Sequence, residues 1–226
     1  MREEIRMAKL TGKIAVITGG VQPQTLAIAK KLAAEDAKAV VVLTNNATED
    51  SAVIKEQGAA CFAYQCNIGN FEDVTRCFTA IKAEQGDIDI LINNPNAVCR
   101  KTLLEMTPAE WNEVLAINVH SMFYCCKQVF ADMKARKTGK IINFSDNEML
   151  GVAGNAAYAI TKASAVGFTG TCARESEKYT VTVNSLTPNG NATPEEVADI
   201  VALLVSEEGR AFHGQHLKVT HSWVEV

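Results

Sequence analysis

Tyr158 and Lys162 are the residues of this sequence whose types and spacing most clearly suggest chemistry. They lie four positions apart in a helical pattern, so both side chains fall on one face of the helix. A phenol titrates near a pH of about 10. An ammonium group one turn away stabilises the phenolate and is expected to lower that pKa. Such a pair can give a proton to a carbonyl oxygen or take one from an alcohol, although the spacing also arises by chance in helices.

Two other polar residues could join this pair. Ser145 follows an apolar strand pattern, thirteen residues before Tyr158, and its hydroxyl could hydrogen-bond the same reacting oxygen. Asn118 is an amide within an otherwise apolar helical stretch. It could belong to a polar relay towards Lys162, or it could be a core asparagine bonded to backbone. The sequence leaves both interpretations open.

A turn beginning with Thr18, Gly19 and Gly20 joins the first apolar strand pattern to an alanine-rich helical pattern. This layout is typical of a dinucleotide-binding βαβ unit, in which backbone N–H groups at a helix start hold a pyrophosphate. Two later glycines of that turn are replaced by Pro23 and Thr25. Proline lacks a backbone N–H and threonine adds a β-branched side chain, so the sequence predicts an altered cofactor seat.

The elements that must position these residues alternate between strand and helix. Several strands are continuously apolar, which favours a parallel sheet buried on both faces. Alternation of this kind indicates an α/β domain with a doubly wound sheet, here a single domain over residues 1–226. Strands are expected at 13–18, 39–44, 60–65, 88–93, 139–144, 180–186 and 215–219, and helices at 24–34, 47–57, 70–85, 108–136, 156–178 and 194–207.

Composition excludes several classes of function. The net charge of −4 and pI of about 5.6 indicate neither a nucleic-acid footprint nor an anionic-membrane surface. No apolar run approaches the roughly 20 residues of a membrane span, and residues 1–7 do not resemble a secretory signal. Seven cysteines without a C-x-x-C motif favour reduced thiols in a cytoplasmic protein. No metal site is expected at His213, His216 or His221, because no acid or cysteine lies at a recognised ligand spacing.

Taken together, the motifs resemble the short-chain dehydrogenase/reductase family, close to its ketoacyl-carrier-protein-reductase-like members, over about residues 13–219. The matches occur in the family's order and at its spacing. They are Thr18-Gly19-Gly20 for the start of the glycine turn, Asn67 and Ile68 for the adenine-side pair, Asn93-Asn94 for the stretch after the fourth strand, Asn118, Ser145, Tyr158 and Lys162 for the catalytic tetrad, and Val183-Asn184-Ser185 with Pro188 after the sixth strand.

The resemblance implies a Rossmann-type fold of about seven strands with helices on both faces, NAD or NADP as cofactor, and hydride transfer to or from a small carbonyl or alcohol substrate. Tyr158 is the implied acid/base, supported by Lys162, with Ser145 orienting the substrate and Asn118 in a proton relay. Asp146 competes with Ser145 for its place when residues are counted from Gly139. The implied cofactor-binding residues are Thr18, Gly19, Gly20, Asn67, Ile68, Asn93, Asn94, Lys162 and Pro188. A homodimer or homotetramer through helices 108–136 and 156–178 is also expected.

Other departures from the family cluster at cofactor-facing positions. Asn67 stands where the family has an acid, Asn96 stands where it has glycine, and only residues 189–193 separate Pro188 from the last helix, where the family places a substrate lid. These changes keep an alternative open: a dinucleotide-independent relative, either a binding or assembly subunit or a non-redox acid/base catalyst using Tyr158. A product that merely folds is not excluded by the sequence. Neither an acid nor a base follows the second strand directly, so NAD and NADP are not distinguished.

Overall fold

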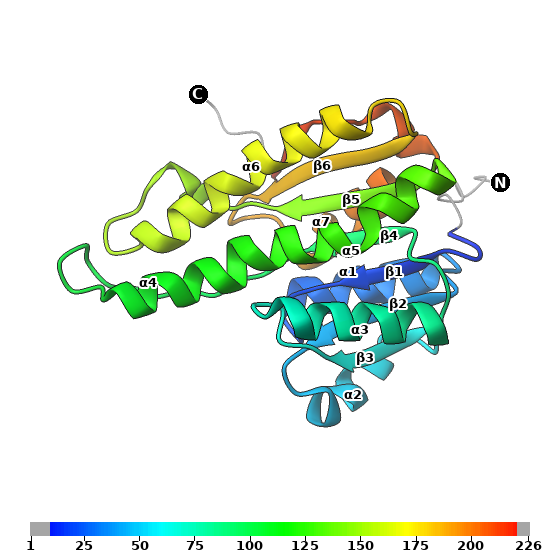
Figure 1. The fold of residues 1–226 in the computed structure, drawn as a ribbon, viewed down its shortest axis with the longest axis horizontal. Coiled ribbons are helices and arrows are strands. Elements are labelled where there is room, and N and C mark those ends of the chain that lie inside the picture. Colours follow the sequence, from blue (N-terminus) through cyan, green and yellow to red (C-terminus); the bar gives the residue numbers. More distant parts are fainter. Residues whose placement is uncertain (1–9, 221–226) are drawn as a thin grey trace.

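Seven parallel strands form one sheet in the computed structural model, which describes residues 10–220 (Figure 1). The strand order is β3-β2-β1-β4-β5-β6-β7, so the chain runs outward from β1 in one direction and then continues from β4 in the other. This order confirms the expected Rossmann-type doubly wound sheet. The strands are β1 (Ile14–Ile17), β2 (Ala39–Thr44), β3 (Cys61–Gln65), β4 (Ile90–Asn93), β5 (Gly139–Phe144), β6 (Val181–Pro188) and β7 (His216–Val219).

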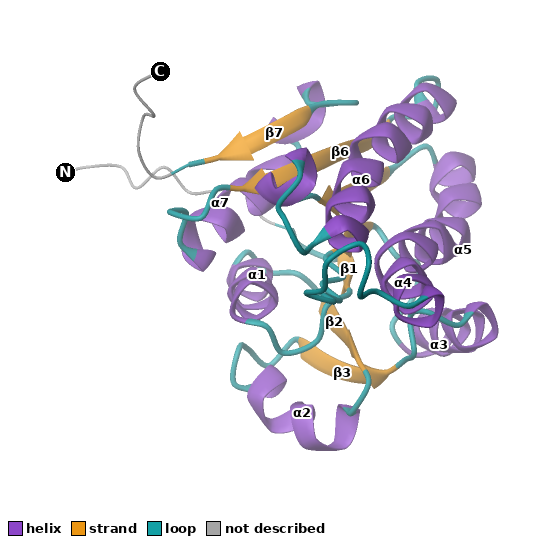
Figure 2. Cartoon of the chain, turned by 90° about the vertical axis from the view of Figure 1, so that its left-hand side faces the viewer, coloured by secondary structure: helices purple, strands orange, loops and turns teal. Residues whose placement is uncertain are grey.

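Helices cover both faces of the sheet because successive strand residues point to opposite sides (Figure 2). On β1, Ala15 and Ile17 join one buried cluster, and Ile14 and Val16 join the other. The first cluster packs under α1 (Pro23–Ala34), α2 (Ala47–Lys55) and α7 (Pro194–Val205). The second packs under α3 (Phe71–Glu84), α5 (Ser121–Arg136) and α6 (Ala156–Ser176).

The expected helix over 108–136 is interrupted. It consists of α4 (Pro108–Leu115), a π-helical turn (Ala116–His120) and α5. A π turn inserts one extra residue and is common at functional sites. Here it contains Asn118, whose buried side chain bonds to the backbone of Ala97. The prediction of one continuous helix is therefore wrong at this turn, because an amide in a helical pattern does not reveal that the helix widens around it.

Capping boxes start two helices as the sequence indicates. The Thr107 hydroxyl accepts from the backbone of Glu110 and caps α4, and the Thr193 hydroxyl accepts from the backbone of Glu196 and caps α7. Each box pairs two otherwise unsatisfied backbone N–H groups. Because α7 begins at Pro194, it follows β6 after only a short connection.

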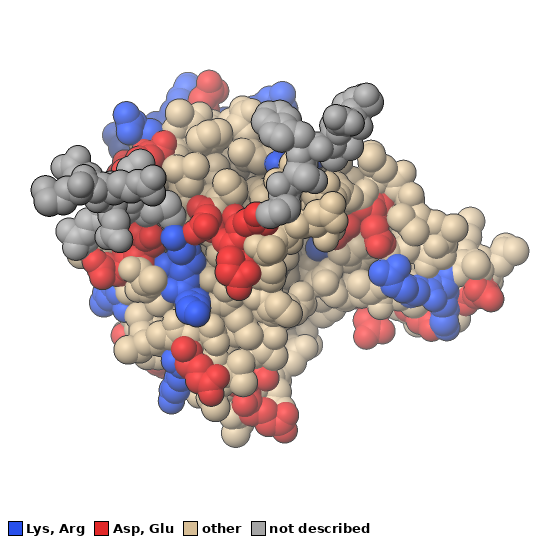
Figure 3. Space-filling model, turned by 180° about the vertical axis from the view of Figure 1, so that it is seen from behind, with Lys and Arg blue, Asp and Glu red and all other residues tan. Residues whose placement is uncertain are grey.

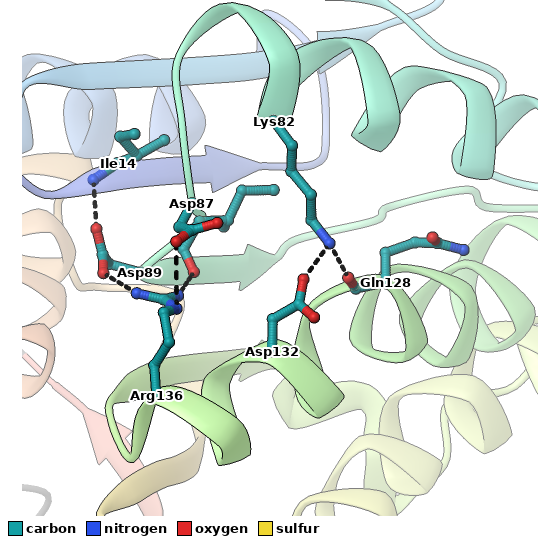
Figure 4. Close-up of polar contacts among 8 residues, drawn as sticks. Ile14, Lys82, Asp87, Asp89, Gln128, Asp132 and Arg136 are labelled. Atoms are coloured by element: carbon teal, nitrogen blue, oxygen red, sulfur yellow. Dashed lines mark hydrogen bonds and ion pairs between the residues drawn. The ribbon is translucent and has the colours of Figure 1, made fainter.

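Ion pairs clamp the amino ends of β1 and β4 (Figure 4). Arg136 of α5 lies 2.9 Å from Asp89, and the Asp89 carboxylate accepts from the backbone N–H of Ile14 at 3.1 Å. Lys82 of α3 donates to the carbonyl of Gln128 on α5 at 2.8 Å. These contacts join α3 to α5, and α5 to the amino ends of β1 and β4, and leave the carboxyl ends of the strands for the site.

The surface carries no extended patch of one sign on the face shown in Figure 3, where Lys and Arg alternate with Asp and Glu. Between residues 10 and 220, no helix combines the length and apolar character of a membrane span. The expectations for residues 1–7 and for His221 fall outside the described residues.

Gly209 supports a stability prediction. It lies in a short 3₁₀ helix (Glu208–Ala211), and a Cβ added there would lie 2.7 Å from Leu204 Cα and also against the Leu203 carbonyl oxygen. Since neither is a movable side-chain end, Gly209→Ala should lower the free energy of unfolding by about 1–3 kcal/mol in urea denaturation. Gly167→Ala on α6 is the control, because a Cβ there meets nothing within 4 Å and should add about 0.5–1 kcal/mol. Equal stabilities for the two variants would contradict this packing.

Candidate active site

The site lies at the carboxyl ends of the strands, where the strand order reverses between β1 and β4. Two adjoining pockets open there. The first, about 450 Å³, lies between the β1–α1 turn and the end of β2. The second, about 400 Å³, lies beside α6 and holds Tyr158 and Lys162. Gln22 and Asn96 line both pockets, so the two form one crevice long enough to receive an extended ligand.

The turn after β1 uses both of its glycines. Gly19 has φ +116° and Gly20 has φ +64°, a region that favours glycine. A Cβ on Gly19 would lie 2.5 Å from the Asn94 carbonyl oxygen. Thr18 contributes from beneath, because its hydroxyl accepts from the Asn94 backbone N–H at 2.9 Å. The turn is therefore held against the end of β4.

Thr25 does not obstruct the crevice. Its side chain is fully buried, and its hydroxyl accepts from the Asn94 amide at 3.2 Å. The same oxygen would lie 3.0 Å from a Cβ on Gly19, so Thr25 packs beneath the turn. Neither Thr25 nor Pro23 lines either pocket. The Thr25 side chain therefore does not narrow the crevice, whereas the effect of the missing backbone N–H at Pro23 on a bound pyrophosphate stays a prediction.

Tyr158 and Lys162 are brought together as the sequence predicts. Both are buried in the first half of α6, with the Lys162 Nζ 5.2 Å from the centroid of the Tyr158 ring. The Nζ donates to the Pro95 carbonyl oxygen at 2.7 Å, which fixes the ammonium group. Burial lowers the pKa of Lys162 to about 8, although the nearby Asp146 carboxylate opposes this shift.

The Tyr158 hydroxyl points into the second pocket. It donates to the Asn96 Oδ1 at 2.7 Å and lies 3.3 Å from the Asp146 Oδ2. Burial raises the pKa of Tyr158 above its usual value, and the Asp146 carboxylate raises it further. The expectation of a lowered pKa is therefore wrong in this arrangement. The anionic Asp146 lies at the hydroxyl itself, whereas the Lys162 ammonium is directed to a backbone carbonyl.

The structure distinguishes Ser145 from Asp146. The Ser145 hydroxyl donates to the Lys162 carbonyl oxygen at 2.8 Å and also lies 3.3 Å from the Met149 sulfur. It therefore braces α6, although Ser145 also borders the pocket. The Asp146 side chain is the one that meets Tyr158. The geometry thus agrees with counting from Gly139 rather than back from Tyr158.

Asn118 supports the site indirectly. Its Oδ1 accepts from the Ala97 N–H at 2.8 Å, and its Nδ2 donates to the Ala97 carbonyl at 2.8 Å and to the Thr161 hydroxyl at 3.1 Å. These bonds brace the segment whose Pro95 carbonyl holds Lys162. Asn118 is therefore bonded to backbone, as one interpretation expects, and its part in a proton relay towards Lys162 stays a prediction.

The other expected residues divide into two groups. Asn93 is buried within the sheet, where it donates to Asn143 at 2.8 Å, and the Asn67 side chain accepts from the Gly69 N–H at 3.1 Å. With Thr18 and Asn118, these residues lie outside both pockets. Those that the structure brings to the crevice are Gly19, Gly20 and Ile68 in the first pocket and Asn94, Ser145, Tyr158, Lys162 and Pro188 in the second.

Gln22, Gln24 and Asp50 are among the crevice residues that were not anticipated from the sequence. Asp50 reaches the first pocket from the first turn of α2. The only sequence signal for it was an acid shortly after β2, which is also common in any first helical turn. Gln22 and Gln24 lie within the glycine turn, at positions where the motif allows any residue.

The family is shown by comparison with known proteins. A family model described as short chain dehydrogenase matches residues 13–199. The chain belongs to the short-chain dehydrogenase family. This short-chain dehydrogenase is 31% identical to a 3-oxoacyl-[acyl-carrier-protein] reductase of Synechocystis, over 91% of this chain and 94% of the relative. It is 31% identical to an acetoacetyl-CoA reductase of Cupriavidus necator, over 88% and 93%, and 36% identical to a 2-dehydro-3-deoxy-D-gluconate 5-dehydrogenase of Formosa agariphila, over 80% and 70%.

These relatives and the family support an NAD(P)-dependent oxidoreductase and do not favour the dinucleotide-independent alternative. The crevice of this short-chain dehydrogenase also fits such a cofactor. Gln24, the second residue of α1, lines the second pocket, and its buried Nε2 has no hydrogen-bond partner among the described residues. Gly19 and Gly20 leave the wall of the first pocket free of side chains there.

Proposed function

We propose that this enzyme reduces the carbonyl group of a small molecule, or oxidises the corresponding alcohol, with NAD or NADP as cofactor and Tyr158 as the acid/base. The supporting observation is the Tyr158 hydroxyl, which projects into the pocket next to an ammonium group buried behind it. A nicotinamide ring, when bound, supplies or accepts the hydride. The residues that would hold the cofactor are Gly19, Gly20, Gln22, Gln24, Ile68 and Asn94.

In the reductive direction Tyr158 donates its hydroxyl proton to the carbonyl oxygen, and a phenolate remains. The Lys162 ammonium, 5.2 Å from the ring centroid, stabilises that negative charge. The phenolate is reprotonated from solvent, which reaches the pocket because only residues 189–193 bridge β6 and α7. In the oxidative direction the same groups act in reverse, with the phenolate accepting the alcohol proton.

The charges of the second pocket indicate a class of substrate. Its charged lining residues are Asp146, Glu148 and Lys162, and the lysine is buried and bonded to a carbonyl. Among the residues that line this pocket, a carboxylate or phosphate next to Tyr158 would therefore face two acids and no free cation, and the nearby Arg100 is already paired with Glu148 at 3.5 Å. We propose that the reacting end of the substrate is neutral, and that any charged portion extends out of the open mouth of the pocket.

Binding of the reduced cofactor tests the function. NADH or NADPH should raise the melting temperature in proportion to the logarithm of its concentration, because a ligand that binds only the folded state stabilises it by mass action. Nicotinamide fluorescence should report the same saturation. If neither cofactor at millimolar concentration changes the melting temperature or the fluorescence, the redox function is rejected.

A second copy of this chain is the partner that we propose for the α5–α6 face. An apolar groove of about 590 Å³ runs between these helices, lined by aromatic residues that include Phe123, Phe130, Phe168 and Tyr179. Large apolar grooves rimmed by lysines are typical of protein interfaces. We also propose a cytoplasmic location, supported by seven cysteines that all remain free thiols.

Light scattering tests the proposed dimer or tetramer. Phe123, which is 49% exposed, should become a buried contact, so Phe123→Glu is expected to shift the assembly to monomer at micromolar concentration. Leu104→Glu is the matched control, since Leu104 is 96% exposed and lies away from this groove. A wild-type protein that is already monomeric would contradict the proposal.

A further inference from the structure

Asp50 places a carboxylate in the pocket at the end of β2. The Thr44 hydroxyl, on the last residue of β2, donates to the Asp50 Oδ2 and also accepts from the Asn46 N–H at 3.3 Å. This small network turns the Asp50 side chain from α2 back over the strand end. One carboxylate oxygen is engaged by Thr44, which leaves the other able to accept a hydrogen bond.

The charged residues that line the first pocket are all acidic. Its lining contains Asp50 and Glu113 and, among the described residues, no lysine, arginine or histidine. The uncharged lining residues include the polar Thr44, Asn45 and Asn46 and the apolar Ile68 and Ile117. Such a pocket suits a neutral nucleoside, with an apolar wall for a flat base and polar groups for the sugar.

The two nicotinamide cofactors differ at a single position of the adenosine ribose. NAD carries a 2′-hydroxyl there, which can donate to a carboxylate, and NADP carries a 2′-phosphate with close to two negative charges. A phosphate of that kind is normally recognised by arginine or lysine. Next to Asp50 and Glu113, with no cation in the lining, it would meet repulsion without compensation.

We infer that this pocket selects NAD(H) over NADP(H) and that Asp50 is the specificity-determining residue. The inference rests on the proposed redox function and adds the identity of the cofactor. No acid that could distinguish NAD from NADP directly follows β2. The acid comes instead from the first turn of α2, where Asp50 lies beside Thr44.

Dissociation constants measured by nicotinamide fluorescence test the inference. The wild-type enzyme should bind NADH at least about tenfold more tightly than NADPH, the ratio that 1.4 kcal/mol provides. Asp50→Asn should shrink that ratio several-fold by weakening NADH binding and strengthening NADPH binding. Glu49→Gln is the matched control, because it removes the same charge from the neighbouring exposed position, outside the pocket, and should leave the ratio unchanged.

The outcomes distinguish a failure of the cofactor selectivity from a failure of the redox function. NADPH binding as tight as NADH, with either cofactor saturating, overturns the selectivity and leaves the redox function intact. Equal ratios for Asp50→Asn and Glu49→Gln remove Asp50 as the determinant. No binding of either cofactor rejects both claims. Asp50→Ser, with melting temperatures for all variants, checks that a changed ratio does not come from local unfolding of α2.

Discussion

Replacing Tyr158 by Phe should lower kcat for carbonyl reduction by about 10²–10⁴-fold, the usual contribution of a positioned general acid. Only the hydroxyl is lost, and it is the atom that projects into the second pocket and contacts Asn96 and Asp146. The ring stays buried beside the Lys162 ammonium, so the helix and the pocket should keep their shape. We therefore expect the dissociation constant of the reduced cofactor to change little.

Steady-state kinetics and cofactor titration of the same preparation test this prediction. Tyr124→Phe is the matched control, since it removes a phenol from α5 at a site that lines neither pocket of the crevice. Its kcat should equal that of the wild type. A Tyr158→Phe enzyme with near-normal kcat would reject Tyr158 as the proton donor, whereas loss of cofactor binding in parallel with kcat would indicate a structural role.

Replacing Asp146 by Asn should move the pH dependence of alcohol oxidation to lower pH. Oxidation needs the phenolate form of Tyr158, and in the structure burial and the Asp146 carboxylate both raise the pKa of that phenol. Burial, the larger cause, remains in the variant, while the charge is removed. The pKa of Tyr158 should then fall but stay above its ordinary value. Each unit by which the pKa of Tyr158 falls should raise the oxidation rate about tenfold at pH values below the new pKa.

The effect on the rate should be confined to the oxidative direction. Near neutral pH the phenol is protonated in both enzymes, so the rate of carbonyl reduction should change little. Asp146 also raises the pKa of Lys162, which burial lowers to about 8, so its removal should move the loss of the ammonium charge to lower pH as well. Both the rising and the falling limb of the kcat/KM profile for oxidation should therefore move to lower pH.

Glu148→Gln provides a graded control for Asp146. Glu148 is a weaker contributor to the raised pKa of Tyr158 and makes no hydrogen bond to its hydroxyl. Its replacement should move the oxidation profile in the same direction by less than Asp146→Asn does. Identical profiles for the wild type and Asp146→Asn would show that the carboxylate does not control the phenol.

The sequence by itself determined the class of fold and indicated the residues that we propose to carry the chemistry. Alternating strand and helix patterns, continuous apolar strands and the two capping boxes at Thr107 and Thr193 are local signals, and local signals are read directly from residue order. The spacing of Tyr158 and Lys162 also acts within one helix, so their pairing followed from helical geometry alone. Family motifs in order along the chain then indicated the sheet on which these residues are mounted.

Only the tertiary structure decided which atoms face the crevice. The orientation of Ser145 and Asp146 depends on how the chain leaves β5 and where α6 packs, so counting residues from either side gave two answers. Thr25 turned away from the ligand side because Gly19 and Asn94 make room for it beneath the turn. Asp50 joined the pocket across a loop, through Thr44. These contacts join residues from separate elements, and their geometry depends on side-chain packing that no periodicity in the sequence encodes.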